Sequence, residues 1–267
     1  MALKESSSSA RLDAELLLAH ALGRSRVQLY GDPKSKVRPE IVARFSMLVR
    51  ERRQGRPVAQ LVGVREFWSL DLTVTADTLI PRPETELLVE RALLRISEEL
   101  SADVLDLGTG SGAIALAIAT ERPHAQIVAT DLSEPALAVA RYNARSLGID
   151  QVEFHFGDWL SAAKGLRFST IVSNPPYITD KEWVLRGPEL NYEPQLALRG
   201  GRDGLLAIRR IVERAPDFLH PGGWLLIEHG FRQGPAVAGL FQEAGFAAIT
   251  TYRDLPGHPR ITEGRLE

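Results

Sequence analysis

The 267-residue sequence contains no cysteine, which excludes a disulfide, a thiolate metal site and a cysteine nucleophile. It also lacks an excess of one charge, because 32 lysines and arginines face 34 aspartates and glutamates, a formal net charge of -2. Proteins that wrap a nucleic acid backbone carry a strong positive balance, so we expect no stable nucleic acid partner. The six histidines show no metal-ligand spacing, and we expect no bound metal.

The sequence also has no apolar run long enough for a signal peptide or a membrane span. Its first ten residues are polar and rich in serine. We therefore expect a protein of the cytoplasm that has no membrane partner. The sequence carries no signal for an oligomer, and a monomer is the default expectation. The length exceeds that of a usual single domain and predicts a main domain with a smaller one beside it.

Apolar periodicity divides the first third of the chain into two parts. Helical spacing predicts helices over 12–22 and 39–53, which together form a small all-α domain over residues 1–62. Apolar and polar residues then alternate from Glu66 to Thr75, a pattern typical of a hairpin. The sequence therefore predicts a β-hairpin linker over residues 63–82.

The rest of the chain, residues 83–267, starts with a helix that Pro83 can open and then alternates between apolar runs and amphipathic helices. This alternation predicts an α/β fold, a doubly wound and mostly parallel seven-stranded sheet that is covered on both faces. In such a sheet, ligands bind beyond the carboxyl ends of the strands, where the strand order reverses.

A glycine-rich turn follows the first predicted strand of this sheet and consists of Gly108, Thr109, Gly110, Ser111 and Gly112. Missing side chains let a ligand touch the backbone, and the amino end of the next helix favours a carboxylate or a phosphate. The spacing Gly-x-Gly-x-Gly differs from the dinucleotide fingerprint, so the turn alone does not select a cofactor.

Acidic and aromatic residues end the next two predicted strands. Asp131 lies about twenty residues after the glycine turn, where a carboxylate can accept hydrogen bonds from two ribose hydroxyls and repels a phosphate. This leaves NAD or the adenosine of S-adenosylmethionine as the ligand, unless Asp131 only caps the turn before Ser133. Asp158 and Trp159 can accept from an adenine amino group and wall its ring, or they can cap a turn and fill the core.

The fourth predicted strand runs directly into Asn174, Pro175, Pro176 and Tyr177. Each proline fixes its own φ at about -65° and lacks an NH, so this corner is stiff. The Asn174 oxygen and the Pro175 carbonyl are acceptors, and Tyr177 offers a flat face. The corner suits a planar group that bears an NH2, whereas a shorter Asn-Pro pair would indicate only a turn.

Six motifs follow one another in the order typical of a single family: Glu66-Phe67-Trp68, Ile80 to Glu86, Asp106 to Gly112, Ser173 to Ile178, Glu193-Pro194 and Glu228-His229-Gly230. With them, the chain resembles the HemK/PrmC release factor glutamine methyltransferases over nearly its whole length. The resemblance implies a class I methyltransferase that uses S-adenosyl-L-methionine. Its implied partners are class 1 peptide chain release factors, methylated on the glutamine side-chain nitrogen of their Gly-Gly-Gln motif, which tunes translation termination.

The resemblance also implies roles for single residues. The cofactor would be held by Gly108, Thr109, Gly110, Ser111, Gly112, Asp131, Asp158, Trp159 and Asn174. The glutamine would be held by Asn174, Pro175, Pro176 and Tyr177, and of these Asn174, Pro175 and Tyr177 would be catalytic. Phe67 and the Pro81 to Thr85 loop, through Arg82, would close the pocket. The helical domain would recognise the substrate, although family members commonly carry a longer helix ahead of Leu12.

Three other functions compete with this one. An adenine-amino DNA methyltransferase uses a similar Asn/Asp-Pro-Pro-Tyr site, but it needs a base-flipping and target-reading module, and no insertion or basic segment here is large enough for one. A binding protein that has lost catalysis would not need to keep Asn174 to Tyr177 intact. An NAD-linked dehydrogenase would not need that tetrapeptide at all.

Overall fold

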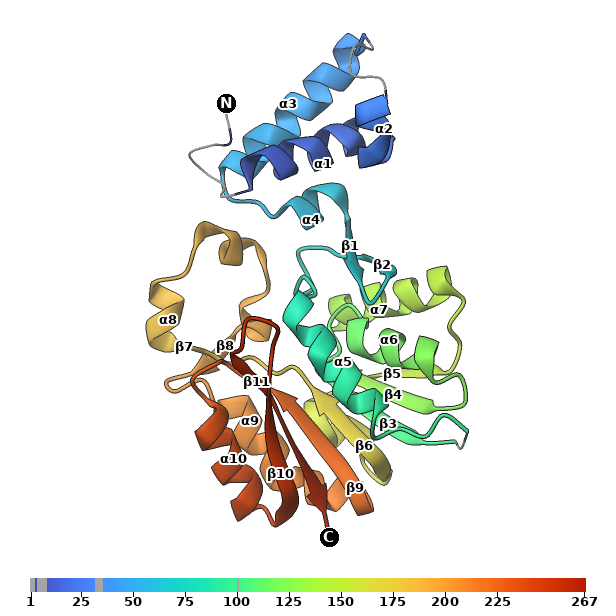
Figure 1. Cartoon of the computed structure of the whole chain (residues 1–267), viewed down its shortest axis with the longest axis vertical. Coiled ribbons are helices and arrows are strands. Elements are labelled where there is room, and N and C mark those ends of the chain that lie inside the picture. Colours follow the sequence, from blue (N-terminus) through green and yellow to red (C-terminus); the bar gives the residue numbers. More distant parts are fainter. Residues whose placement is uncertain (1–2, 4–8, 32–35, 100) are drawn as a thin grey trace.

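The computed structural model describes residues 3, 9–31, 36–99 and 101–267. Helices α1 (Ala10–Leu22), α2 (Arg26–Gly31), α3 (Pro39–Arg53) and α4 (Val58–Val62) lie together at one end of the molecule (Figure 1). The helices predicted over 12–22 and 39–53 correspond to α1 and α3. The sequence did not reveal α2 and α4, because six and five residues are too short to display a helical period. Much of the stretch ahead of Leu12 lies outside the described residues.

An apolar cluster and a buried ion pair hold these helices together. Leu17, Leu48 and Leu61 pack against one another on the inside. Arg52 donates to Asp13 across 2.7 Å, and both side chains are 6% exposed. Arg52 also pairs with Glu189 of the large domain at 2.6 Å, so the same guanidinium connects the two parts of the chain.

The predicted hairpin is present, and it joins the helical unit to the sheet (Figure 1). Strands β1 (Val64–Phe67) and β2 (Leu70–Thr73) pair antiparallel. Trp68 and Ser69 form the turn with φ of 52° and 61°, values that suit a tight hairpin. The side chain of Asn143 bonds the backbone NH and the carbonyl of Thr73 at 2.9 and 3.1 Å, which fixes the hairpin to helix α7 (Glu134–Leu147).

The predicted doubly wound sheet is confirmed. Its seven strands lie in the order β10-β11-β9-β6-β3-β4-β5, and only β11 runs against its neighbours. The strands are β3 (Asp103–Leu107), β4 (Gln126–Asp131), β5 (Val152–Phe156), β6 (Phe168–Ser173), β9 (Leu219–Glu228), β10 (Phe246–Arg253) and β11 (Pro259–Leu266). The order reverses between β3 and β6, so their carboxyl ends form the expected crevice.

Alternate residues of the strands fill two cores, one on each face of the sheet. On one face, Val104, Val172 and Leu226 pack with helices α5 (Glu86–Leu93) and α6 (Ala113–Glu121). On the other face, neighbouring strand residues pack with α9 (Leu206–Arg214), the short helix η5 (Ala215–Phe218) and α10 (Gly234–Glu243). Strands whose residues are buried on both faces of the sheet are what the continuous apolar runs in the sequence predict.

The sequence patterns did not reveal an insertion between β6 and α9. Its elements are β7 (Ile178–Thr179), α8 (Asp180–Val184), the short helices η3 (Pro188–Tyr192) and η4 (Gln195–Ala197), and β8 (Arg199–Gly201). Strands β7 and β8 form a small parallel pair. Gln60 of α4 donates to the Tyr192 carbonyl at 2.8 Å, so the insertion touches the helical unit as well as the sheet. Among the described helices, none combines the length and apolarity that crossing a bilayer requires.

Candidate active site

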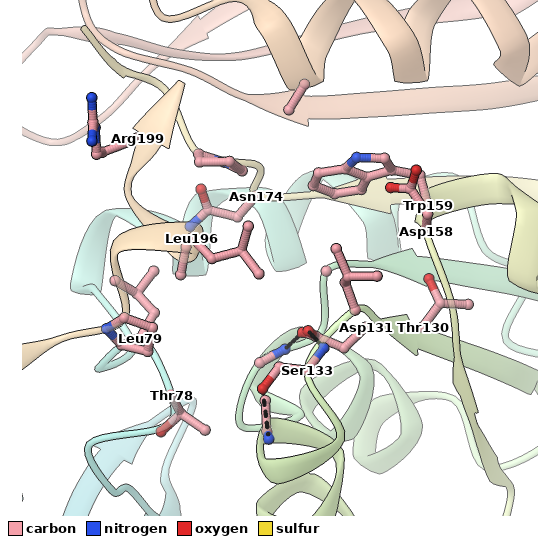
Figure 2. Close-up of a pocket in the computed structure, with 18 of the residues that line it drawn as sticks. Thr78, Leu79, Thr130, Asp131, Ser133, Asp158, Trp159, Asn174, Leu196 and Arg199 are labelled. Atoms are coloured by element: carbon pink, nitrogen blue, oxygen red, sulfur yellow. Dashed lines mark hydrogen bonds between the residues drawn. The ribbon is translucent and has the colours of Figure 1, made fainter. Parts of the chain in front are cut away.

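Two cavities meet at the carboxyl ends of β3 and β6. The larger, of about 230 Å³, is lined by the glycine turn, the ends of β4 and β5 and part of the insertion. The smaller, of about 130 Å³, is lined by the corner after β6 and the segment around Arg82. Asn174, Leu79 and Ala197 line both cavities. A group bound in one cavity therefore comes close to a group bound in the other beside Asn174. Figure 2 shows Asn174 on the wall of the larger cavity.

The glycine turn contributes backbone to the larger cavity. Gly108 and Gly110 line it, with φ of 73° and 58°. A Cβ added at Gly108 would lie 3.1 Å from the Trp159 ring, so a side chain there would crowd the cavity wall.

The three other residues of the turn do not line either cavity. Thr109 is buried and donates to Asp106 at 2.6 Å, and Ser111 is buried with its carbonyl bonded to Asn143. A Cβ at Gly112 would lie 3.0 Å from Leu116, because this glycine packs closely where α6 begins. These residues shape the turn, and their contact with a cofactor stays a prediction.

Asp106, beneath the turn, is fully buried, and burial raises the pKa of its carboxyl group to about 7. The raised pKa means that ionisation of Asp106 costs free energy only in the folded state. The free energy of unfolding should therefore fall as the pH rises from about 4 to about 7, by at most about 1.4 kcal/mol per pH unit. Thr109 donates to one oxygen, while Oδ1 has no partner among the described residues.

Asp106→Asn removes this ionisation, so the variant should gain stability relative to the parent as the pH rises from 5 to 8. Urea unfolding at both pH values measures the difference. Asp103→Asn, at an exposed position of the same strand, is the control and should leave the pH dependence unchanged. An equal pH dependence in the parent and in Asp106→Asn would contradict the prediction.

Asp131 lines the larger cavity and also holds its wall in shape. Its two oxygens accept backbone hydrogen bonds from Gly110 at 2.8 Å and Ser133 at 2.9 Å (Figure 2). Burial raises the pKa of this carboxyl group, and the backbone donors oppose the rise. Ser133 is the residue that caps α7, by accepting from Ala136. Asp131 thus ties the glycine turn to the start of α7 at the cavity edge.

Asp158 and Trp159, from the turn after β5, line the same cavity beside Thr130 (Figure 2). Trp159 has φ of 48°, an uncommon value for a bulky residue, and its ring lies over Gly108. The neighbouring Leu160 is buried and fills the core. The position of Trp159 therefore suits a cavity wall.

The corner after β6 is held by hydrogen bonds from both of its polar side chains. The Asn174 amide NH2 donates to the Thr85 hydroxyl at 3.1 Å, which leaves the Asn174 oxygen as an acceptor for a ligand. The Tyr177 hydroxyl donates to Glu228 at 3.2 Å, and burial raises the pKa of Tyr177 well above its ordinary value. Tyr177 therefore stays protonated. Pro175 and Pro176 line the smaller and the larger cavity, respectively.

Arg82 lines the smaller cavity, as its predicted role requires. It donates to one oxygen of the buried Glu193 at 2.5 Å, and the Ile80 backbone NH donates to the other at 2.9 Å. Glu193 thereby fastens this segment to the insertion. The interpretation of Phe67 needs correction, because its ring is 1% exposed in the core with Leu72 and lines neither cavity.

The sequence predicted only that Thr85 belongs to the Pro81 to Thr85 loop that closes the pocket, and it assigned no role to Glu228. Both are buried and lie against the corner. Burial raises the pKa of the Glu228 carboxyl group to about 7, and interactions with the Thr85 and Tyr177 hydroxyls oppose the rise. The segment that carries Leu79 and the insertion that carries Leu196 were also missed as walls of the larger cavity.

Comparisons with known proteins agree with this site. Residues 1–63 match the PrmC N-terminal domain, and residues 83–186 match the methyltransferase small domain. The release factor glutamine methyltransferase of Xylella fastidiosa (strain 9a5c) is 49% identical over 255 residues, which are 96% of this chain and 93% of that protein. The protein of the same name from Escherichia coli (strain K12) is 44% identical over 261 residues, 98% of this chain and 94% of that protein.

A solved methyltransferase from Pyrococcus furiosus has a similar fold, with a TM-score of 0.56 and 18% identity over 73% of this chain and 88% of that one. This likeness concerns the fold, and the matched family models and relatives make the chain an S-adenosylmethionine-dependent methyltransferase. Identity of 44% to 49% over nearly the full length then confirms the resemblance found in the sequence: the chain belongs to the HemK/PrmC family of release factor glutamine methyltransferases.

Proposed function

We propose that the protein transfers a methyl group from S-adenosylmethionine to the side-chain nitrogen of the glutamine in the Gly-Gly-Gln motif of class 1 release factors. The observation that carries this proposal is the position of Asn174 between the two cavities. The protein would act on this translation factor as a monomer in the cytoplasm. Residues 1–62 would recognise the partner, residues 63–82 would link the domains, and residues 83–267 would carry out the transfer.

The larger cavity fits the cofactor. Bare backbone at Gly108 leaves room against the Trp159 ring, and the Asp131 carboxylate at the rim suits two ribose hydroxyls. Asp158 offers a further acceptor on the same wall. When bound, S-adenosylmethionine supplies a methyl group attached to a positively charged sulfur, and this sulfur is a good leaving group.

The smaller cavity fits the carboxamide of the substrate. The Asn174 oxygen and the Pro175 carbonyl can each accept one NH of the glutamine amide, which fixes the nitrogen and leaves its lone pair facing the larger cavity. The Tyr177 ring can pack on the amide plane, with Arg82 along the wall of this cavity and Pro176 facing the larger one. Thr85 holds the other end of Asn174.

Positioning carries most of this chemistry. An amide nitrogen is a poor nucleophile because its lone pair is delocalised into the carbonyl. Tyr177 is not available as a base, since burial raises its pKa. Near-attack alignment of two bound reactants contributes roughly 7 to 11 kcal/mol. The two acceptors also stabilise the positive charge that grows on the nitrogen during transfer.

The test incubates the purified protein with methyl-labelled S-adenosylmethionine and one of three acceptors: a class 1 release factor, the same factor with its Gly-Gly-Gln glutamine replaced by alanine, or DNA. We expect label on the intact factor alone, because only this acceptor presents the carboxamide. Label on DNA alone would overturn the proposal in favour of an adenine-amino methyltransferase. Equal label on the glutamine-to-alanine factor would show that another group is the acceptor.

A further inference from the structure

The two ends of an asparagine amide have almost the same shape but opposite hydrogen-bonding character. Only the oxygen end of Asn174 can accept an NH of the substrate amide. If the side chain turned over, its NH2 would face the substrate NH2, and two donors would oppose each other. The proposed function, on which this inference rests, therefore requires a device that keeps the Asn174 oxygen toward the smaller cavity.

The first part of such a device is Thr85, which is 4% exposed and accepts from the Asn174 NH2 at 3.1 Å. A hydroxyl group has one hydrogen and two lone pairs, so Thr85 could hold Asn174 in either orientation. When a Thr85 lone pair faces Asn174, it accepts from the Asn174 NH2 and favours the observed orientation. When the Thr85 hydrogen faces Asn174, it would donate to the Asn174 oxygen and favour the reversed orientation. The orientation of Asn174 is thus decided by where the Thr85 hydrogen points.

The second part is Glu228, which is 1% exposed at the carboxyl end of β9. It accepts from the Tyr177 hydroxyl at 3.2 Å, and the Thr85 hydroxyl lies near enough to lower the pKa of its carboxyl group. Its Oε2 is buried without a hydrogen-bond partner among the described residues and so has acceptor capacity left. Because an ionised carboxylate only accepts, it attracts the Thr85 hydrogen and leaves the Thr85 lone pair to the Asn174 NH2.

We propose that Glu228 is a positioning residue that acts through Thr85 to hold Asn174 with its oxygen toward the substrate amide. The same carboxylate holds Tyr177, so a single buried charge orients both polar side chains of the corner. Asn174 touches the substrate, whereas Thr85 and Glu228 act through it.

The device should work only while Glu228 is ionised, since a protonated carboxyl group can donate to Thr85 and release the Thr85 hydrogen toward Asn174. Burial raises the pKa of Glu228, the hydroxyls of Thr85 and Tyr177 and the Arg260 charge oppose the rise, and Glu84 adds to it, which together give a pKa of about 7. Turnover should therefore decline as the pH falls through the neutral range.

The test measures kcat, the KM for the release factor and the Kd for S-adenosylmethionine between pH 5.5 and 9. Glu228→Gln keeps the shape but can donate to Thr85, so we expect kcat to fall on the order of 100-fold. KM and Kd should stay within about threefold of the parent, because the lost interaction acts on alignment rather than on binding. The decline of kcat on the acid side should disappear. Glu213→Gln, on the exposed side of α9, is the matched control and should behave as the parent.

Thr85 supplies an independent pair of variants. Thr85→Ser keeps the hydroxyl and should retain kcat within about threefold, whereas Thr85→Val should lose as much as Glu228→Gln. Combining Thr85→Val with Glu228→Gln should cost no more than either change alone, because both remove the same device. If Glu228→Gln does not fold, the serine and valine variants decide the question.

Two negative results have separate meanings. A parent protein that methylates no release factor defeats the proposed function. A parent that methylates the release factor, while Glu228→Gln or Thr85→Val keeps full kcat and the parent pH profile, overturns this inference and leaves the proposed function standing.

Discussion

Asn174→Ala is expected to lower kcat on the order of 100- to 1,000-fold, the usual effect of removing one preorganised hydrogen-bonding group from a site of developing charge. The alanine leaves the substrate nitrogen without its side-chain acceptor, while Pro175 still offers its carbonyl. The Kd for S-adenosylmethionine should change less than about threefold, since the glycine turn, Asp131 and Trp159 are untouched. Single-turnover methyl transfer and equilibrium cofactor binding measure the two quantities separately.

The matched control for this change is Asn191→Ala. Asn191 is exposed in η3, and its side chain accepts a hydrogen bond from Arg186 as its one side-chain contact of this kind among the described residues. Its loss should therefore leave both kcat and cofactor affinity near those of the parent. Equal losses of kcat and of cofactor affinity in Asn174→Ala would contradict the role given to Asn174. They would show that this residue holds the cofactor rather than the acceptor amide.

Periodicity in the sequence was enough to predict the sheet. Strand runs such as 104–107 and 169–172 carry apolar residues for both faces, and the helices between them carry their own period, so each element is visible locally. The reversal of strand order then places the glycine turn and Asn174 at the same edge. The sequence alone therefore predicts that the glycine turn and Asn174 lie together in one site.

The directions of side chains within the site were harder to predict from the sequence. The motif around Phe67 suggested a pocket wall, but Phe67 and Leu72 point to the inner face of the hairpin and fill the core. In the glycine turn, Thr109 turns inward because Asp106 below it needs a donor. Both outcomes depend on neighbours that are distant in sequence or on buried charge, and a linear motif reveals neither.

The insertion and the Thr85 to Glu228 contacts were hidden for a related reason. Elements such as η3 and β8 are too short to have a period, and they are ordered by tertiary bonds such as that from Gln60 to Tyr192. Thr85 lies directly ahead of α5 and Glu228 ends β9, so these two residues are distant in the sequence and come close only in the folded domain. Their polar character was visible in the sequence, but their partners were not.

Gly200→Ala is the second change with a large expected effect, because β8 packs directly on the backbone of the corner. A Cβ at this position would lie 2.6 Å from the Gly204 carbonyl oxygen and 2.7 Å from the Pro176 carbonyl oxygen. Both atoms belong to the backbone and cannot rotate away, so either β8 or the corner must shift. Overpacking of this kind typically costs about 1 to 3 kcal/mol of stability.

Catalysis should suffer more than stability, since a displacement of about 1 Å at the reacting groups can cost on the order of 100-fold in rate. We therefore expect Gly200→Ala to lower the thermal unfolding temperature modestly and kcat strongly. Gly239→Ala, in the middle of α10, is the matched control, because within the described part of the chain the added Cβ would meet nothing within 4 Å beyond its chain neighbours and its own helix backbone. It should raise stability by about 0.5 to 1 kcal/mol and leave kcat unchanged. If Gly200→Ala retained the parent kcat, the rate would not depend on the fixed position of the corner, and the positioning role of the Asn174 to Tyr177 segment would have to be abandoned.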